Sequence, residues 1–163
     1  MTDDFYGCII VERSNIALNG DGHTIQSGYS YGIHLDHVNN VTVFNITVTS
    51  ESTSIMLDKA TNCRIVNNTV TESMAGITLD EAENCAILNN TISGNTYGIK
   101  LDEAENSVVE YNLIADNSRY GVELYYASDN IVRHNTIVDN GIDGIYIRGS
   151  SGNTINLQHH HVQ

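Results

Sequence analysis

The apolar residues of this chain recur with a period of 22 or 23 residues. Each period is marked by a tetrapeptide close to Gly-Ile-x-Leu, in which the third position varies and the others stay small or apolar. The copies lie at residues 32–35, 54–57, 76–79, 98–101, 121–124 and 144–147, and a degenerate first copy lies at 7–11. A repeat of this length is typical of a solenoid, in which each unit buries its apolar face against its neighbours.

Two further apolar columns recur in the same register, and each alternates with polar residues as a half-buried strand does. One contains Val43, Ile65, Ile87, Val109, Val132 and Ile155, and the other contains Val48, Val70, Ile92, Ile114 and Ile137. No window has the 3.6-residue periodicity of a helix long enough to matter. The pattern predicts an all-β fold, a right-handed single-stranded parallel β-helix. It has about seven coils of 22–24 residues and three short parallel sheets over residues 1–157, followed by a tail at 158–163.

Two polar columns repeat as strictly as the core. Asparagine recurs at Asn68, Asn90, Asn112 and Asn135, where we expect it to adopt the left-handed turn conformation and to bond its amide to the next copy. Because Ile46 occupies this place in the preceding coil, the ladder is expected to start at Asn68. A second column contains Cys63, Cys85 and Ser107, which are expected to serve as small core residues.

Charge and cysteine content narrow the class of protein. The formal net charge is −13 with only 7 Lys and Arg residues, which disfavours a nucleic-acid partner and fits cation binding or simple solubility. Three widely spaced cysteines form neither a disulfide framework nor a zinc motif. No apolar run is long enough for a transmembrane helix, so membrane insertion is not expected, and the acidic start lacks the pattern of a signal peptide.

Residues 7–16 and 19–25 resemble the opening of NosD-like β-helix domains, and the repeated Asn-Asn-Thr-Ile and Gly-Ile-x-Leu units are similar to the same group. These domains are also described as carbohydrate-binding and sugar-hydrolase (CASH) domains. The resemblance implies an exported archaeal protein that is extracellular, on the cell surface or periplasmic. Members include surface proteins, copper-insertion accessories and, more distantly, polysaccharide lyases and epimerases. The Asp-Pro-His-Asp type of signature seen in alginate epimerases is absent, since the chain has no proline.

The residues that break the repeat gather on the Gly-Ile-x-Leu strands of the later coils. Exposed tyrosine rings beside charged groups suit a sugar, whose apolar face packs on the ring while its hydroxyls bond the charged groups. The candidate carbohydrate-binding residues are Tyr97, Tyr120, Tyr125, Tyr146, Asp143 and Arg148. The alternative is that tyrosine is common on exposed strands for structural reasons.

An enzyme on the same face is a second hypothesis. Hydrolysis of a glycosidic bond needs two carboxylates at a set separation, and a lyase needs a base. Lys100, Asp102 and Glu123 are the residues that would serve. No required cofactor is evident.

Acidic turns give a candidate calcium site, because the hexapeptide at 79–84 recurs unchanged at 101–106. Stacked carboxylates repel one another, and calcium, which takes oxygen ligands, would relieve the repulsion. The residues concerned are Asp58, Asp80, Asp102, Glu81 and Glu103. Alternatively, the aspartates accept hydrogen bonds from turn amides and the glutamates point into water.

A metal-handling role is the third hypothesis. Copper binding would require clustered His, Met or Cys residues. His34, His37, Met56 and Cys63 are spread over two coils, and His159, His160 and His161 fall in the tail. Neither end carries a capping helix, so we expect a longer parent protein or end-to-end self-association. The favoured function is a non-catalytic surface or scaffold module that binds polysaccharide or another glycan.

Overall fold

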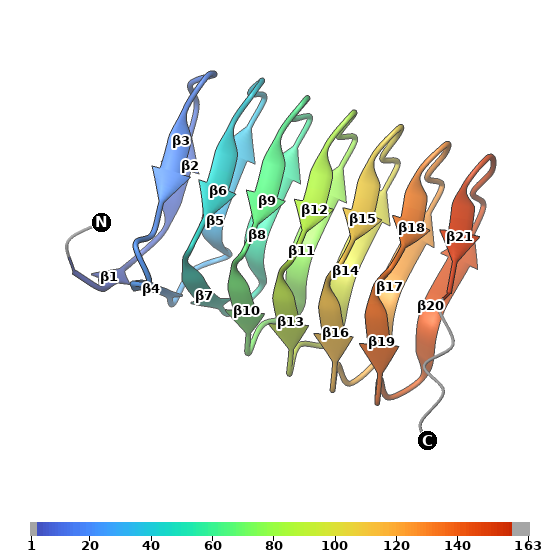
Figure 1. Ribbon diagram of the computed structural model, residues 1–163. Coiled ribbons are helices and arrows are strands. Elements are labelled where there is room, and N and C mark those ends of the chain that lie inside the picture. Colours follow the sequence, from blue (N-terminus) through green and yellow to red (C-terminus); the bar gives the residue numbers. More distant parts are fainter. Residues whose placement is uncertain (1–2, 158–163) are drawn as a thin grey trace.

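The computed structural model describes residues 3–157, which form 21 strands and, within that range, no helix (Figure 1). The strands wind into a right-handed solenoid of about seven coils, and each full coil contributes one strand to each of three parallel sheets. This confirms the predicted fold class. Residues 158–163, the predicted tail with its three histidines, lie outside the described residues.

The three sheets are named here by their strands. The long sheet contains β2 (Ile9–Val11), β5 (Tyr31–Asp36), β8 (Thr53–Asp58), β11 (Ala75–Asp80), β14 (Tyr97–Asp102), β17 (Tyr120–Tyr125) and β20 (Asp143–Arg148). The second sheet contains β3 (Ala17–Asn19), β6 (Thr42–Phe44), β9 (Arg64–Val66), β12 (Ala86–Leu88), β15 (Val108–Glu110), β18 (Ile131–Arg133) and β21 (Thr154–Asn156). The third sheet contains β1 (Phe5–Tyr6), β4 (Thr24–Ser27), β7 (Thr47–Ser50), β10 (Thr69–Thr71), β13 (Thr91–Ser93), β16 (Leu113–Ala115) and β19 (Thr136–Val138).

The core is a set of stacked apolar columns, one for each inward position of the coil. Ile55 pairs in register with Ile77 and Ile77 pairs with Ile99, and all three side chains are fully buried. Burial of such a side chain stabilises the fold by about 1.5–3 kcal/mol. Each column continues through the stack, so the predicted apolar register is confirmed, including the degenerate first copy, in which Ile9 pairs with Ile33.

The strands of the long sheet extend further than the sequence pattern predicts. From β5 onward each has six residues and runs from the position before glycine to the position after the Gly-Ile-x-Leu unit. Asp58, for example, ends β8 in register with Asp36 on one side and Asp80 on the other. The flanking columns are therefore part of the sheet, and their side chains form one outer face with the variable column.

The predicted asparagine ladder is present, but its conformation differs from the prediction. Asn68 Nδ2 donates to Asn90 Oδ1 (3.1 Å), and Asn90 Nδ2 donates to Asn112 Oδ1 (3.0 Å), with both side chains buried. The left-handed residue is the one before each ladder member, such as Asn67 at φ 56° and Asn89 at φ 54°. That residue turns the chain, and the turn points the next side chain inward, where it satisfies backbone groups of adjacent coils.

The start of this ladder agrees with the prediction, because the backbone N–H of Ile46 donates to Asn68 Oδ1 (3.2 Å). A ladder that was not predicted follows the third-sheet strands β13, β16 and β19, where Asn95 Nδ2 donates to Asn117 Oδ1 (3.1 Å) and Asn117 Nδ2 donates to Asn140 Oδ1 (2.9 Å). Both ladders hold the turns of neighbouring coils in register.

Cys63 and Cys85 are small core residues, as predicted, and their column becomes polar in the later coils. Cys63 and Cys85 are free and buried, and their thiols contact backbone carbonyls. The hydrogen bond with Cys63 and burial raise the pKa of the Cys85 thiol, so this thiol stays neutral. One coil on, Ser107 accepts a hydrogen bond from the Cys85 N–H (3.0 Å), and Asn130 then begins a third amide ladder.

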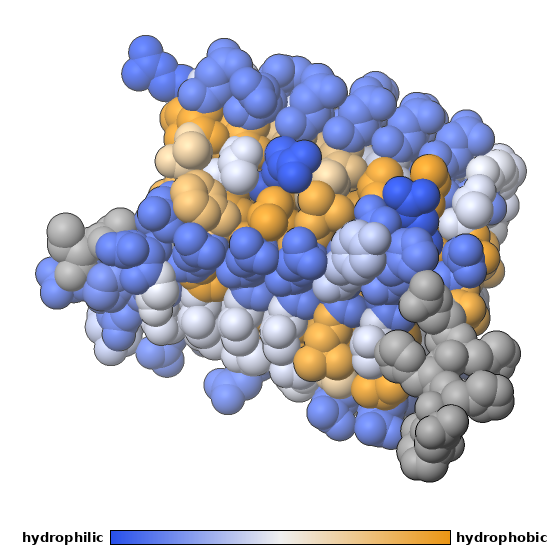
Figure 2. Space-filling view, viewed as in Figure 1, coloured by the Kyte–Doolittle hydropathy of each residue, from blue (hydrophilic) through white to orange (hydrophobic). Residues whose placement is uncertain are grey.

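Apolar side chains reach the surface in two places. Figure 2 shows an apolar band along the face over the second sheet, where Val66, Leu88 and Val108 are half-buried. At the last coil Ile147 is 49% exposed, because no further coil covers it within the described residues. End-to-end self-association stays a prediction. Among residues 3–157 no helix is long and apolar enough to cross a membrane.

Candidate functional site

The outer face of the long sheet carries the candidate site, because its side chains are not needed for the core. In these strands the glycine and the next residue both face the core, so the outward positions are the residue before glycine, the variable residue and the last residue. Parallel coils stack about 4.8 Å apart. His34, Met56, Thr78 and Lys100 therefore follow one another along the solenoid axis, as their register pairs confirm. The column before glycine runs beside them and contains Tyr31, Thr53, Ala75 and Tyr97.

Three of the predicted carbohydrate-binding tyrosines form one aromatic cluster. The ring of Tyr120 lies parallel to that of Tyr146 with centroids 4.6 Å apart, and it meets Tyr97 edge-on at 5.9 Å. The expectation of an exposed ring is wrong for Tyr120, which is only 8% exposed. Tyr97 and Tyr146 are half-buried and so present part of their surface to solvent.

Two cations lie over this cluster. Lys100 Nζ is 5.1 Å from the centre of the Tyr97 ring, and the guanidinium carbon of Arg119 lies 5.4 Å from the same ring. Arg119 also donates a hydrogen bond to the Tyr97 hydroxyl. The sequence analysis missed Arg119 because it stands in the turn before β17, outside the repeated columns.

The other predicted aromatic contact lies at the far edge of the same face. Tyr125 meets Tyr126 edge-on with centroids 4.6 Å apart, and the Arg148 guanidinium carbon lies 5.7 Å from the Tyr125 ring. Asp143 and Arg148 are exposed in the last coil, and Asp143 pairs in register with Tyr120. Tyr125 and Arg148 are thus brought together at the carboxyl ends of β17 and β20, whereas Tyr120 of the three-ring cluster stands at the amino end of β17.

The proposed catalytic trio is brought together in part. Lys100 Nζ lies 3.6 Å from Glu123 Oε2, and the Glu123 side chain is only 13% exposed. Asp102 lies two residues after Lys100 on the same strand and in register with Tyr125. Lys100 and Glu123 therefore form an ion pair on the outer face of the sheet.

A cleft of about 280 Å³ opens on this face between Tyr31 and Tyr97. Its floor is low because small side chains, Ala75 and Thr78, stand in the coil between the larger ones. The Thr78 hydroxyl is buried and has no hydrogen-bond partner. Met56, Met74, Asp80, Lys100 and Asp102 complete most of the lining, so the cleft combines apolar surface with hydrogen-bonding groups.

A larger hollow, of about 360 Å³, lies around the turns near Asn45 and has no aromatic lining. Its lining offers one ionisable side chain, Asp21. The cleft on the long sheet is smaller but holds the rings, the cation and the unsatisfied hydroxyl, so we place the candidate site there.

The predicted acidic column lies along one border of the cleft. Asp58, Asp80 and Asp102 pair in register, and burial, followed by the charges of Asp102 and Asp58, raises the pKa of the Asp80 carboxyl. Glu81 and Glu103 occupy exposed left-handed positions just after the strands, and Glu81 pairs with Lys59 (3.5 Å). The turn amides bond to backbone carbonyls, as the Lys59 N–H does to Asp80 O (2.9 Å). Calcium binding at these residues stays a prediction.

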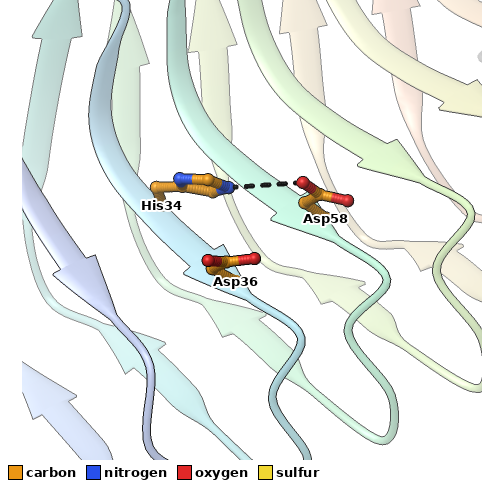
Figure 3. A group of neighbouring side chains, drawn as sticks. All are labelled: His34, Asp36 and Asp58. Carbon is orange, nitrogen blue, oxygen red and sulfur yellow. Dashed lines mark ion pairs between the residues drawn. The ribbon is translucent and has the colours of Figure 1, made fainter.

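The residues weighed for copper separate into two groups. His34 and Met56 are in register on the long sheet, whereas Cys63 is buried in the column before the second sheet. His34 does have two carboxylate neighbours, Asp36 and Asp58 (Figure 3). The hydrogen bond with His37 lowers the pKa of the Asp36 carboxyl, so Asp36 is ionised at neutral pH.

Comparison with known proteins agrees with this architecture. Residues 31–163 match a family model described as the right handed beta helix region. The chain therefore belongs to the right-handed β-helix family. A search of curated protein sequences returns no match.

Several solved structures share the fold. They include the periplasmic alginate epimerase AlgG (20% identity, TM-score 0.74, 93% of this chain and 45% of that one). The Azotobacter vinelandii mannuronan C-5 epimerase AlgE4 A-module is similar as well (14%, 0.74, 94% and 50%). Endopolygalacturonase I from Stereum purpureum is a third (16%, 0.64, 94% and 64%). These identities establish the fold alone, and the chain spans about half the length of the two epimerases.

Proposed function

We propose that this protein is a carbohydrate-binding β-helix module that holds an extended saccharide in the cleft of the long sheet, between Tyr31 and Tyr97. The observation that carries the proposal is the Thr78 hydroxyl, which is buried at the cleft floor without a hydrogen-bond partner. A buried hydroxyl without a partner is costly, and rotation of the Thr78 side chain toward a sugar hydroxyl in the cleft would satisfy it.

The walls of the cleft suit the rest of a sugar ring. Tyr97 offers an apolar ring edge held in place by Arg119, and Lys100 offers a donor beside it. Asp80 and Asp102 offer acceptors for sugar hydroxyls. Three coil steps separate Tyr31 from Tyr97, about 14 Å at ~4.8 Å per step, so a ligand would run parallel to the solenoid axis.

The related structures support a saccharide ligand, since their names describe enzymes of alginate and polygalacturonate. The proposal is a binding role without catalysis, in a NosD-like module that is extracellular, on a cell surface or periplasmic. Lys100, Asp102 and Glu123 remain the residues to test for activity. A calcium ion on the acidic column would be compatible with this role.

The test is a polysaccharide array followed by calorimetry with the best ligand. Tyr97→Ala should weaken binding at least tenfold, because it removes the ring that forms one wall. Thr78→Val should weaken binding about three- to tenfold. It removes only the hydroxyl, which has no protein partner to lose, so the fold should be unaffected.

Tyr6→Ala is the matched control, because Tyr6 is 79% exposed on β1 of the third sheet. Its affinity should equal that of the unmodified chain. Absence of binding across the array, or equal binding by all three variants, would refute the proposal. Release of unsaturated or reducing ends from a polysaccharide would instead assign the enzyme alternative.

A further inference from the structure

A histidine and two aspartates meet near the carboxyl ends of β5 and β8, two neighbouring strands of the long sheet. His34 and Asp36 lie two residues apart on β5 and so point to the same side, and Asp58 ends the neighbouring strand β8 in register with Asp36. One ligand atom from each of the three residues lies within 4.8 Å of the others. Figure 3 shows the imidazole and both carboxylates converging on a common space.

The His34 ring packs against a neighbouring ring, but its Nε2 nitrogen has no hydrogen bond. The ring packs on Tyr31 with centroids 4.6 Å apart, and the side chain is only 14% exposed. Nε2 is buried without a hydrogen-bond partner, and its nearest carboxylate oxygen, Asp58 Oδ2, is 3.7 Å away. That distance is too long for a hydrogen bond. Two ligands held at ~2.1 Å by one tetrahedral zinc ion are about 3.4 Å apart, which is close to the observed separation.

The surroundings supply the remaining features of a metal site. His37 forms a hydrogen bond with Asp36 through Nδ1, and such outer contacts orient ligating carboxylates. Two carboxylates with a neutral imidazole carry a charge of −2, which a divalent cation balances. Asp80 continues the column from Asp58 and adds to the negative field.

We propose that His34, Asp36 and Asp58 bind one divalent first-row transition metal, with zinc as the representative ion. Imidazole nitrogen favours this class of metal over calcium and magnesium, which take oxygen ligands. Three protein ligands leave a coordination position for water or a ligand group. This site adjoins the cleft, because His34 packs on Tyr31, but its ligands do not include Thr78 or Tyr97.

The test is zinc calorimetry on the full chain in which His159, His160 and His161 are replaced by alanine. Those three consecutive histidines would bind the same metals and hide the site. The expected result is one zinc ion per chain. His34→Gln and Asp58→Asn should each weaken binding at least tenfold, and His37→Gln should weaken it less. Cobalt substitution should give a visible absorption spectrum that is lost in the same two variants.

His23→Gln is the matched control, because His23 Nδ1 stands 3.6 Å from Asp4 Oδ1, a histidine–carboxylate pair outside the cluster. Its affinity should be unchanged. Circular dichroism checks that each variant is folded. The proposal is overturned if the tail-substituted chain binds no zinc, if binding survives both ligand substitutions, or if calcium binds as tightly as zinc.

Discussion

Replacing Asn90 by alanine should remove one rung from the middle of the first asparagine ladder. The Asn90 side chain is 1% exposed and makes four hydrogen bonds through one carboxamide. Nδ2 donates to Ile65 O (2.9 Å) and to Asn112 Oδ1 (3.0 Å). Oδ1 accepts from the backbone N–H (2.9 Å) and the Nδ2 (3.1 Å) of Asn68.

The expected loss of stability follows from those contacts. Each intramolecular hydrogen bond contributes about 0.5–1.5 kcal/mol net, and a buried polar group left unpaired costs about 1–3 kcal/mol. The Asn68 N–H would be left in that state. Allowing for the bonds that share one atom, the free energy of unfolding should fall by about 3–5 kcal/mol.

The control is Asn89→Ala, one position earlier. Asn89 is exposed and left-handed at φ 54°, so alanine there should cost only about 1–2 kcal/mol of backbone strain. Urea unfolding followed by circular dichroism gives both values. Hydrogen exchange should report a selective loss of protection at the Asn68 amide. Equal destabilisation by the two variants, or an unchanged Asn68 amide, would refute the role assigned to the ladder.

Three further outcomes are expected. Asp80→Asn should raise the melting temperature at pH 7, since the raised pKa of Asp80 means that its ionised form destabilises the folded chain. The gain in free energy of unfolding should be about 0.2–1 kcal/mol per opposed carboxylate. This gain should vanish below about pH 3.8, where the carboxyl is protonated in the folded and the unfolded chain. A melting temperature that is unchanged at pH 7 would contradict this. Gly98→Ala should destabilise by about 1–3 kcal/mol, because its Cβ would lie 2.4 Å from the Gly121 carbonyl oxygen, whereas Gly28→Ala, with no atom within 4 Å, should be neutral in the same urea titration. Cys85→Asn should leave stability unchanged or raise it by up to about 1 kcal/mol, because its column already accepts asparagine two coils later; a loss above 1 kcal/mol would show that this coil is too tight for an amide.

The repeat predicts the fold almost completely, because one coil's register determines that of all the others. The ambiguity lay in the turns. In the pairs Asn67–Asn68 and Asn89–Asn90 both residues tolerate the left-handed conformation, so composition does not tell which one turns the chain. The later coils contain the answer, since the first position changes to Tyr111 while Asn112 stays. The position that is constant through the stack is the inward one.

The candidate site was harder to predict from the sequence, because it depends on side-chain size and on contacts between neighbouring coils that are not between register partners. The cleft exists because Ala75 and Thr78 are small beside Tyr97. Arg119 lies in a turn that does not repeat. The histidine cluster does have a sequence signal: Asp58 follows Asp36 by one coil of 22 residues and therefore follows His34 by 24. The spacing of a coil length plus two between a histidine and an aspartate is thus the mark of this cluster in the sequence.

The regular stacking of the coils has a consequence for how such a molecule can change. A segment of one coil length, such as residues 81–102, could be duplicated or removed without disturbing the remaining columns, because its two ends meet neighbours of the same kind. The histidine cluster draws on two adjacent strands, β5 and β8, whereas the cleft spans four, β5 to β14. An extra coil inserted between β8 and β11 would leave the cluster whole and divide the cleft. The number of junctions that a site crosses thus sets how readily the chain can grow without losing it.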